Sequence, residues 1–82
     1  MTIEQLAPLT NGLSLYACNQ TVMLDRARIT RLPDRSVEMA FRIAGTDLAP
    51  RLRLSAIRLA ASSLEDMTSA IRHVAARALG CP

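Results

Sequence analysis

Residues 36–43, which read SVEMAFRI, alternate between apolar side chains and polar or small ones. Successive side chains of a β-strand point to opposite faces of a sheet, so this alternation predicts a strand with one apolar and one polar face. The apolar face consists of Val37, Met39, Phe41 and Ile43. These four side chains predict one wall of a hydrophobic core, and the opposite face is left polar.

Two earlier segments show the same period of two, and a turn-like stretch at 18–21 separates them. Residues 13–17 place Leu13, Leu15 and Ala17 on one face. Residues 22–32 place Met23, Ala27 and Ile29 on the apolar face and Arg26, Arg28 and Thr30 on the other. Asp25 interrupts that apolar face, which predicts a strand that begins irregularly or lies at a sheet edge. Pro33 marks a tight connection to the next strand.

Residues 51–60 fit two structures. The alternation of Leu52, Leu54 and Ala56 favours a strand, and a bulge near Ala56 explains why the apolar positions change parity afterwards. A helix starting at Pro50 would also align several apolar side chains. The strand is the favoured interpretation.

Helical periodicity dominates the C-terminal segment. An apolar stripe predicts a helix that packs along one side; it consists of Leu64, Met67, Ile71, Val74, Ala75 and Ala78. Ser62 and Glu65 have the spacing of a capping box, and Gly80 supplies a stop signal. At the other end of the chain, Thr2 and Gln5 predict the start of a short helix.

Together these elements predict one small α+β domain over residues 1–82. A three- or four-stranded antiparallel meander packs against one C-terminal helix, with a short N-terminal helix or arm. The core of an 82-residue chain is thin, which makes homodimerisation attractive.

The basic residues are unusual, because all ten are arginines and the chain contains no lysine. Codon usage in a GC-rich genome explains this composition, and so does selection of an arginine-bearing binding face, since guanidinium groups suit carboxylates and phosphates. The absence of lysine excludes a Schiff base and a P-loop lysine in this chain.

The two cysteines, Cys18 and Cys81, lie far apart in the sequence and form no metal-binding motif. We therefore expect two free thiols, a mobile Cys81 and a reducing, cytoplasmic location. No segment has the roughly 20 apolar residues that cross a bilayer, and residues 1–10 do not resemble a secretory signal. No membrane association is expected.

Candidate catalytic groups are sparse. His73 has no carboxylate at helical spacing to orient it, and no local base or helix start activates Cys18. The carboxylates are scattered, and the glycines do not form a phosphate-binding loop. The sequence therefore predicts a protein that is not an enzyme and that uses neither a cofactor nor a metal.

The polar faces of the strands are the remaining candidate site. If the strand parities hold, one face presents an arginine-rich surface. Its expected contact residues are Tyr16, Arg26, Arg28, Arg42, Arg51 and Arg53, and Arg72 and Arg77 on the C-terminal helix are the second choice. Such a face is often merely solvated and protects a sheet from edge-to-edge aggregation.

The chain shows three resemblances to known groups of proteins. Residues 51–80 resemble the closing strand, loop and helix of fold-type I pyridoxal-phosphate-dependent aminotransferases, but that cofactor requires a lysine. The order of helix, meander and helix is similar to that of double-stranded-RNA-binding domains in outline, without the lysines of that family. In size and type the chain is similar to phage-encoded inhibitors of bacterial defence, antitoxins and adaptors.

The sequence thus favours a small protein-binding module, such as an inhibitor, adaptor or regulatory subunit. A phage-encoded inhibitor of a bacterial system is one form of this expectation. The partner of the module would be a protein with an acidic surface, contacted through the arginine-rich face. The alternative is a nucleic-acid-binding module that uses the same face. A single aromatic residue there and a net charge of +3 make nucleic acid the weaker prediction.

Overall fold

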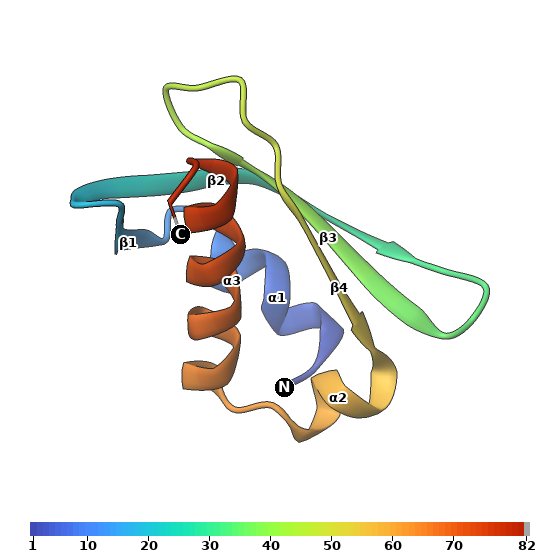
Figure 1. Ribbon diagram of the computed structural model, residues 1–82. Helices are drawn as coiled ribbons and strands as arrows, with labels where there is room; N and C mark the ends of the chain where they lie inside the picture. The colour runs from blue at the N-terminus through green and yellow to red at the C-terminus, as the bar shows by residue number, and fades with distance from the viewer. Residues whose placement is uncertain (82) are drawn as a thin grey trace.

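The computed structural model describes residues 1–81, and its strands form one antiparallel sheet in chain order. The strands are β1 (Ser14–Ala17), β2 (Gln20–Arg31), β3 (Ser36–Ile43) and β4 (Arg51–Ser55). The sheet curls, because β2 pairs through its first residues with β1 and through the rest with β3 (Figure 1). With one helix before the sheet and one at the C-terminus, the expected small α+β fold is confirmed.

A two-residue turn joins β1 to β2. Cys18 and Asn19 both have positive φ angles, 56° and 62°. Two successive left-handed residues are typical of a type I′ turn, whose twist matches that of antiparallel strands. The tight turn fixes the register of the hairpin, in which Tyr16 lies opposite Thr21.

Strand β2 contains a β-bulge, where the pairing with β3 shifts between Asp25 and Arg28. Arg26 adopts the left-handed conformation there, with φ of 53°. The Ala27 backbone N–H donates to Asn11 Oδ1 over 2.9 Å, so this N–H has a partner at the bulge. The bulge reverses the alternation of faces along β2.

This reversal makes the prediction for Met23 wrong. Before the bulge, Leu24 points into the core and is fully buried, whereas Met23 points outward with 51% of its surface exposed. After the bulge, Ala27 and Ile29 lie on the inner side, as expected. Asp25 before the bulge and Arg28 after it both face outward.

Residues 1–81 also contain three helices. They are α1 (Ile3–Thr10), α2 (Ala56–Ala61) and α3 (Leu64–Ala78). The expected cap of α1 is present, since the Thr2 backbone N–H donates to Gln5 Oε1 over 2.8 Å. The bulged strand favoured for residues 51–60 is correct only through Ser55. There, the Ser55 hydroxyl accepts the Arg58 N–H and starts α2.

The predicted boundary of α3 was wrong by one residue. Ser63, rather than Ser62, is the N-cap, and it forms the capping box with Asp66 instead of Glu65. The placement of Leu64 in the buried stripe was also wrong, because Leu64 is the first residue of the helix and is 59% exposed. Met67, Ile71 and Ala75 form the buried stripe that the periodicity predicts.

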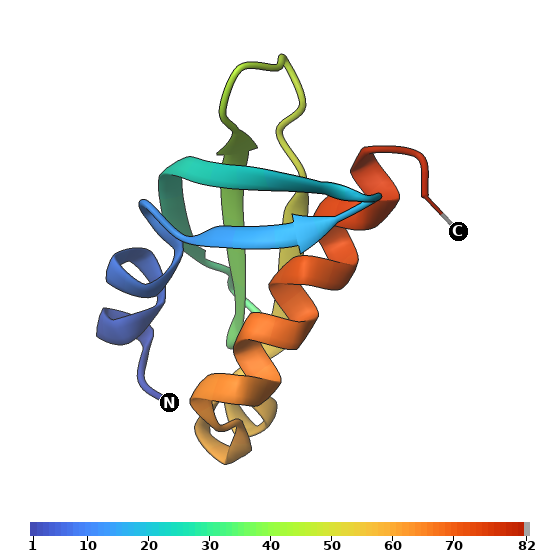
Figure 2. The same cartoon turned by 90° about the vertical axis from the view of Figure 1, so that its left-hand side faces the viewer.

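The core lies on the inner side of the curled sheet. All four apolar residues of β3 are at most 4% exposed, which confirms that face of the strand. α1 contacts β2, and α3 contacts the two edge strands β1 and β4. Figure 2 shows α3 running diagonally along one side of the curl, with α1 on the other. No helix within residues 1–81 is long and apolar enough to cross a membrane.

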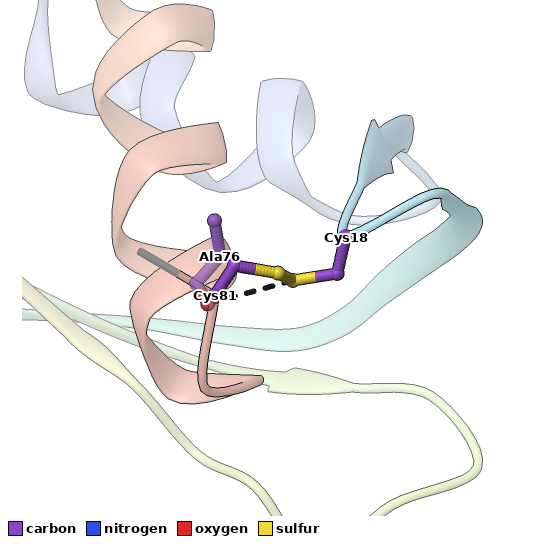
Figure 3. The surroundings of a disulfide bond; sticks show 3 residues. All are labelled: Cys18, Ala76 and Cys81. Atoms are coloured by element: carbon purple, nitrogen blue, oxygen red, sulfur yellow. Dashed lines mark hydrogen bonds between the residues drawn. A yellow bond between two sulfur atoms is a disulfide. The ribbon is translucent and has the colours of Figure 1, made fainter.

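The C-terminal end of α3 is joined to the β1–β2 turn by a Cys18–Cys81 disulfide (Figure 3). Gly80 has φ of 87°, and the Cys81 and Gly80 N–H groups donate to the carbonyls of Ala76 and Arg77. This Schellman motif ends the helix and directs Cys81 back toward Cys18. The expected free thiols and mobile Cys81 are therefore wrong, because folding brings the two Cα atoms within 5.7 Å.

Candidate functional site

The side chains of the four strands that point away from α1 and α3 form a surface that we call the outer face. Its register is set by the pairing, which places Arg28, Ala40 and Arg51 in one row across β2, β3 and β4. Residues directly opposite each other in a sheet share a face, so the methyl group of Ala40 lies between two arginines. The next row contains Thr30, Glu38 and Arg53.

A groove of about 510 Å³ lies over this part of the sheet, and we call it the Ala40 groove. Its lining is mostly charged and includes residues of β2, β3 and β4 and of the loop before β4. The lining residues are Arg26, Arg28, Thr30, Glu38, Ala40, Phe41, Arg42, Asp47, Ala49 and Arg51. Four guanidinium groups therefore face two carboxylates, which leaves the groove positively charged.

Three arginines of the outer face have carboxylate partners within the chain. Arg42 binds Asp25 through two hydrogen bonds, and both side chains are half-buried. Arg51 lies 3.6 Å from Glu38. Arg53 donates to Asp34 over 2.7 Å.

Arg26 and Arg28 differ from these three. Both are exposed, and neither has a carboxylate oxygen within 4.0 Å among the residues that the structure describes. Their guanidinium groups keep all their donors available to a partner molecule. They are the two charged groups of the groove best placed to bind an anion.

Hydrogen bonding changes the pKa values of the carboxylates in these ion pairs. The hydrogen bonds from Arg42 lower the pKa of Asp25, more than partial desolvation raises it. The same contact raises the pKa of Arg42. The hydroxyl and backbone N–H of Ser36, followed by Arg53, lower the pKa of Asp34 to about 2. These carboxylates are therefore ionised at neutral pH and hold their arginines in place.

The structure brings four of the six predicted contact residues together. Arg26, Arg28, Arg42 and Arg51 line the Ala40 groove. Arg53 lies one row away, where it is bound to Asp34. Tyr16 lies outside the groove on β1, 62% exposed on the same outer face. Arg72 and Arg77, the second choice, are exposed on α3 and line no part of this groove.

Sequence reasoning missed Met23 as a surface residue. Met23 lies opposite Ser14 and two residues before Asp25, so it shares the outer face with Tyr16. The signal that could have identified it was Leu24, since an apolar residue adjacent to Met23 competes with it for the inner position. Placing Leu24 inward requires the bulge that the structure contains.

The groups considered for catalysis do not come together. His73 is exposed on α3, beside a groove between β4 and α3 that Asp66 and Arg58 also line. Both sulfurs are joined in the disulfide, with Cys18 Sγ 3.7 Å from the Ala76 carbonyl oxygen. Within residues 1–81, no cluster of three or more histidines, cysteines or carboxylates could hold a metal ion.

Comparison of the chain with protein-family models, with curated proteins and with solved structures found no match.

Proposed function

We propose that the protein is a small binding module that occupies an acidic surface of another protein through its outer face. The observation that carries this proposal is the combination of residues there. Tyr16 on β1 and Met23 on β2 are large and exposed, and the unpaired Arg26 and Arg28 lie farther along β2, at the bulge and just after it. Aromatic residues, methionine and arginine are the residue types enriched in protein interfaces.

A nucleic-acid partner is the alternative that the same arginines allow. Binding to a polyphosphate chain relies on many cations along a continuous track. Carboxylates lie among the arginines, Asp25 and Glu38 on the outer face and Asp34 and Asp47 in the loops beside it, and three arginines are already paired. These carboxylates oppose a polyanion that runs across the sheet, which favours the protein partner.

An affinity capture from lysate of the native host tests the proposal with two matched double variants. Arg26→Glu with Arg28→Glu reverses two charges on the outer face, whereas Arg72→Glu with Arg77→Glu reverses two on α3. We expect a partner that the wild type and the α3 variant retain and the outer-face variant loses. The proposal would be overturned if only the α3 variant lost the partner, or if neither variant lost it.

Salt dependence separates the protein partner from nucleic acid. Binding to oligonucleotides should be weak and should fall steeply with salt, because it depends on counterion release. The captured partner should remain bound at moderate salt, because Tyr16 and Met23 contribute apolar contacts. If oligonucleotides bind more tightly than any protein at physiological salt, the alternative replaces the proposal.

The cytoplasmic location expected from the sequence stays a prediction, and its argument from free thiols no longer applies. Disulfides persist mainly in oxidising compartments. The Cys18–Cys81 pairing therefore favours such a compartment. Alkylation of the protein isolated from its native cells, followed by mass measurement, shows whether the two cysteines are free thiols or a disulfide.

A further inference from the structure

We infer that the Ala40 groove is an acceptor site for one carboxylate of an acidic segment of the partner, held by Arg26, Arg28 and Arg51. This inference rests on the proposed function and identifies the chemistry of its central contact. The other residues of the outer face would surround this contact.

The floor of the groove is the first observation. Ala40 is the central residue of its row, and the long side chains of Arg28 and Arg51 stand on either side of it. Its methyl group leaves room above the sheet that a larger side chain would fill. A carboxylate placed over Ala40 would meet guanidinium groups from β2 and from β4.

The availability of these guanidinium groups is the second observation. Arg26 and Arg28 lack carboxylate partners among residues 1–81. Arg51 is 72% exposed and makes only a 3.6 Å contact with Glu38, and such surface pairs contribute little stability. Arg42, by contrast, is fixed by two hydrogen bonds to Asp25 and serves as a rigid wall.

The conformation of Arg26 is the third observation. A non-glycine residue at φ of 53° costs about 1 kcal/mol or more, and glycine would avoid this cost. The bulge allows Asp25, Arg26 and Arg28 all to contribute to the outer face within four positions of one strand. Bulges commonly redirect side chains beside binding sites.

Glu38 and Asp47 determine which anion fits. Both line the groove together with the arginines. A single carboxylate over Ala40 brings one negative charge into the groove, whereas a chain of phosphates crossing the groove brings several charges past Glu38 and Asp47. Their repulsion selects an isolated acidic side chain over a polyanion.

The test is an NMR titration that follows the Nε–Hε resonances of all ten arginines. The probes are a short synthetic peptide of alternating glycine and glutamate and an oligo-deoxythymidine of equal charge. We expect the peptide to shift the resonances of Arg26, Arg28 and Arg51 most, and those of Arg35, Arg58, Arg72 and Arg77 little. Equal shifts across all ten arginines would overturn the inference, because they indicate a diffuse charge effect.

Three substitutions sharpen the test, and one of them is a control. Ala40→Leu fills the floor and should weaken peptide binding about tenfold, because it displaces charge-assisted hydrogen bonds. Thr21→Leu adds a leucine to the outer face away from the groove and should leave that affinity unchanged. Glu38→Gln should strengthen oligonucleotide binding several-fold more than peptide binding. Unchanged peptide affinity in a folded Ala40→Leu variant contradicts the inference, and so does an unchanged preference in Glu38→Gln.

If Ala40→Leu does not fold, Arg28→Gln replaces it, with Arg35→Gln as its control. Only the Arg28 variant should lose peptide affinity, and equal losses would overturn the inference. The titration needs no host partner, so its failure is separable from failure of the proposed function. Suppose that a captured partner no longer binds the outer-face double variant and still binds the Ala40→Leu variant. That result would support the proposed function and contradict the carboxylate site.

Discussion

Asp25 accepts two hydrogen bonds from Arg42 directly across β2 and β3, from Nε over 2.9 Å and from Nη2 over 2.8 Å. This bidentate pair lies beside the bulge, at the point where β2 changes the face that it buries. It fixes the guanidinium group of Arg42 on β3, while Arg26 and Arg28 on β2 remain unpaired. One arginine at the bulge is therefore structural, and two others are available for binding.

Replacing Asp25 with asparagine should have opposite effects on stability and binding. Asp25→Asn removes the partner of Arg42, so the urea midpoint should fall. It also frees a guanidinium group beside the Ala40 groove, so affinity for the glycine–glutamate peptide should rise about two- to fivefold. Chemical denaturation and the peptide titration measure the two effects.

Glu65→Gln is the control for net charge, since Glu65 lies in the first turn of α3, away from the outer face. It should leave the peptide affinity almost unchanged. An equal rise in both variants would mean that total charge, rather than the release of Arg42, controls the binding.

Stability should decrease in acid because of Asp34. Its pKa is lowered to about 2 in the folded chain, whereas an unfolded aspartate titrates near about 3.9. The unfolded state therefore binds a proton first as the pH falls, and the stabilisation is lost progressively between about pH 5 and pH 2. Urea denaturation at several pH values measures this loss.

Ser36→Ala removes the hydroxyl that contributes most to the low pKa of Asp34. The variant should raise this pKa toward its usual value and should reduce the loss of stability in acid. Carbon-detected NMR titration of the Asp34 carboxyl follows the change. A wild-type Asp34 that titrates near about 3.9 contradicts the prediction.

The fold could be predicted where one periodicity dominates. The strict alternation over residues 36–43 identified all four buried residues of β3. Prediction failed where an element changes locally. The chain switches to α2 at Ala56 through the Ser55 cap, and α3 starts at the Ser63 cap; each is a local hydrogen-bonded choice between neighbouring serines and periods. Residues 51–60 are too few for either the strand period or the helix period to show where the strand ends and the helix begins.

The candidate site was predictable in part for a related reason. Arg26 lies in the bulge and Arg28 follows it, and both line the Ala40 groove, so both were placed correctly on the polar side. Met23 lies before the bulge and was placed on the wrong face. The ion pairs could not be foreseen either, because the Arg42–Asp25 contact depends on a register that the bulge shifts.

The disulfide should contribute strongly to stability. It closes a segment in which the cysteines are 63 positions apart, and loop entropy for that length corresponds to about 4 kcal/mol. Denaturation with and without reductant measures the difference in the free energy of unfolding. The double variant Cys18→Ser with Cys81→Ser should have the lower stability and should not respond to reductant. Equal stability of the oxidised and reduced wild type would contradict the pairing.

Arg26 and Arg35 offer a direct test of whether backbone strain is retained for binding. Both have positive φ angles, 53° and 68°, but Arg26 lines the Ala40 groove and Arg35 lies in the β2–β3 turn. Glycine adopts this conformation without steric cost, although it loses more entropy on folding. Each change to glycine should therefore raise the free energy of unfolding by about 0.5–1 kcal/mol.

The two glycine variants should differ in binding, because each removes one positive charge but only Arg26→Gly removes it from the groove. Peptide affinity should fall about tenfold in Arg26→Gly and stay near the wild-type value in Arg35→Gly. Urea denaturation and the peptide titration give both quantities for the same samples. If Arg26→Gly gains stability and keeps its affinity, the strained arginine has no part in binding, and the bulge serves only the curl of the sheet.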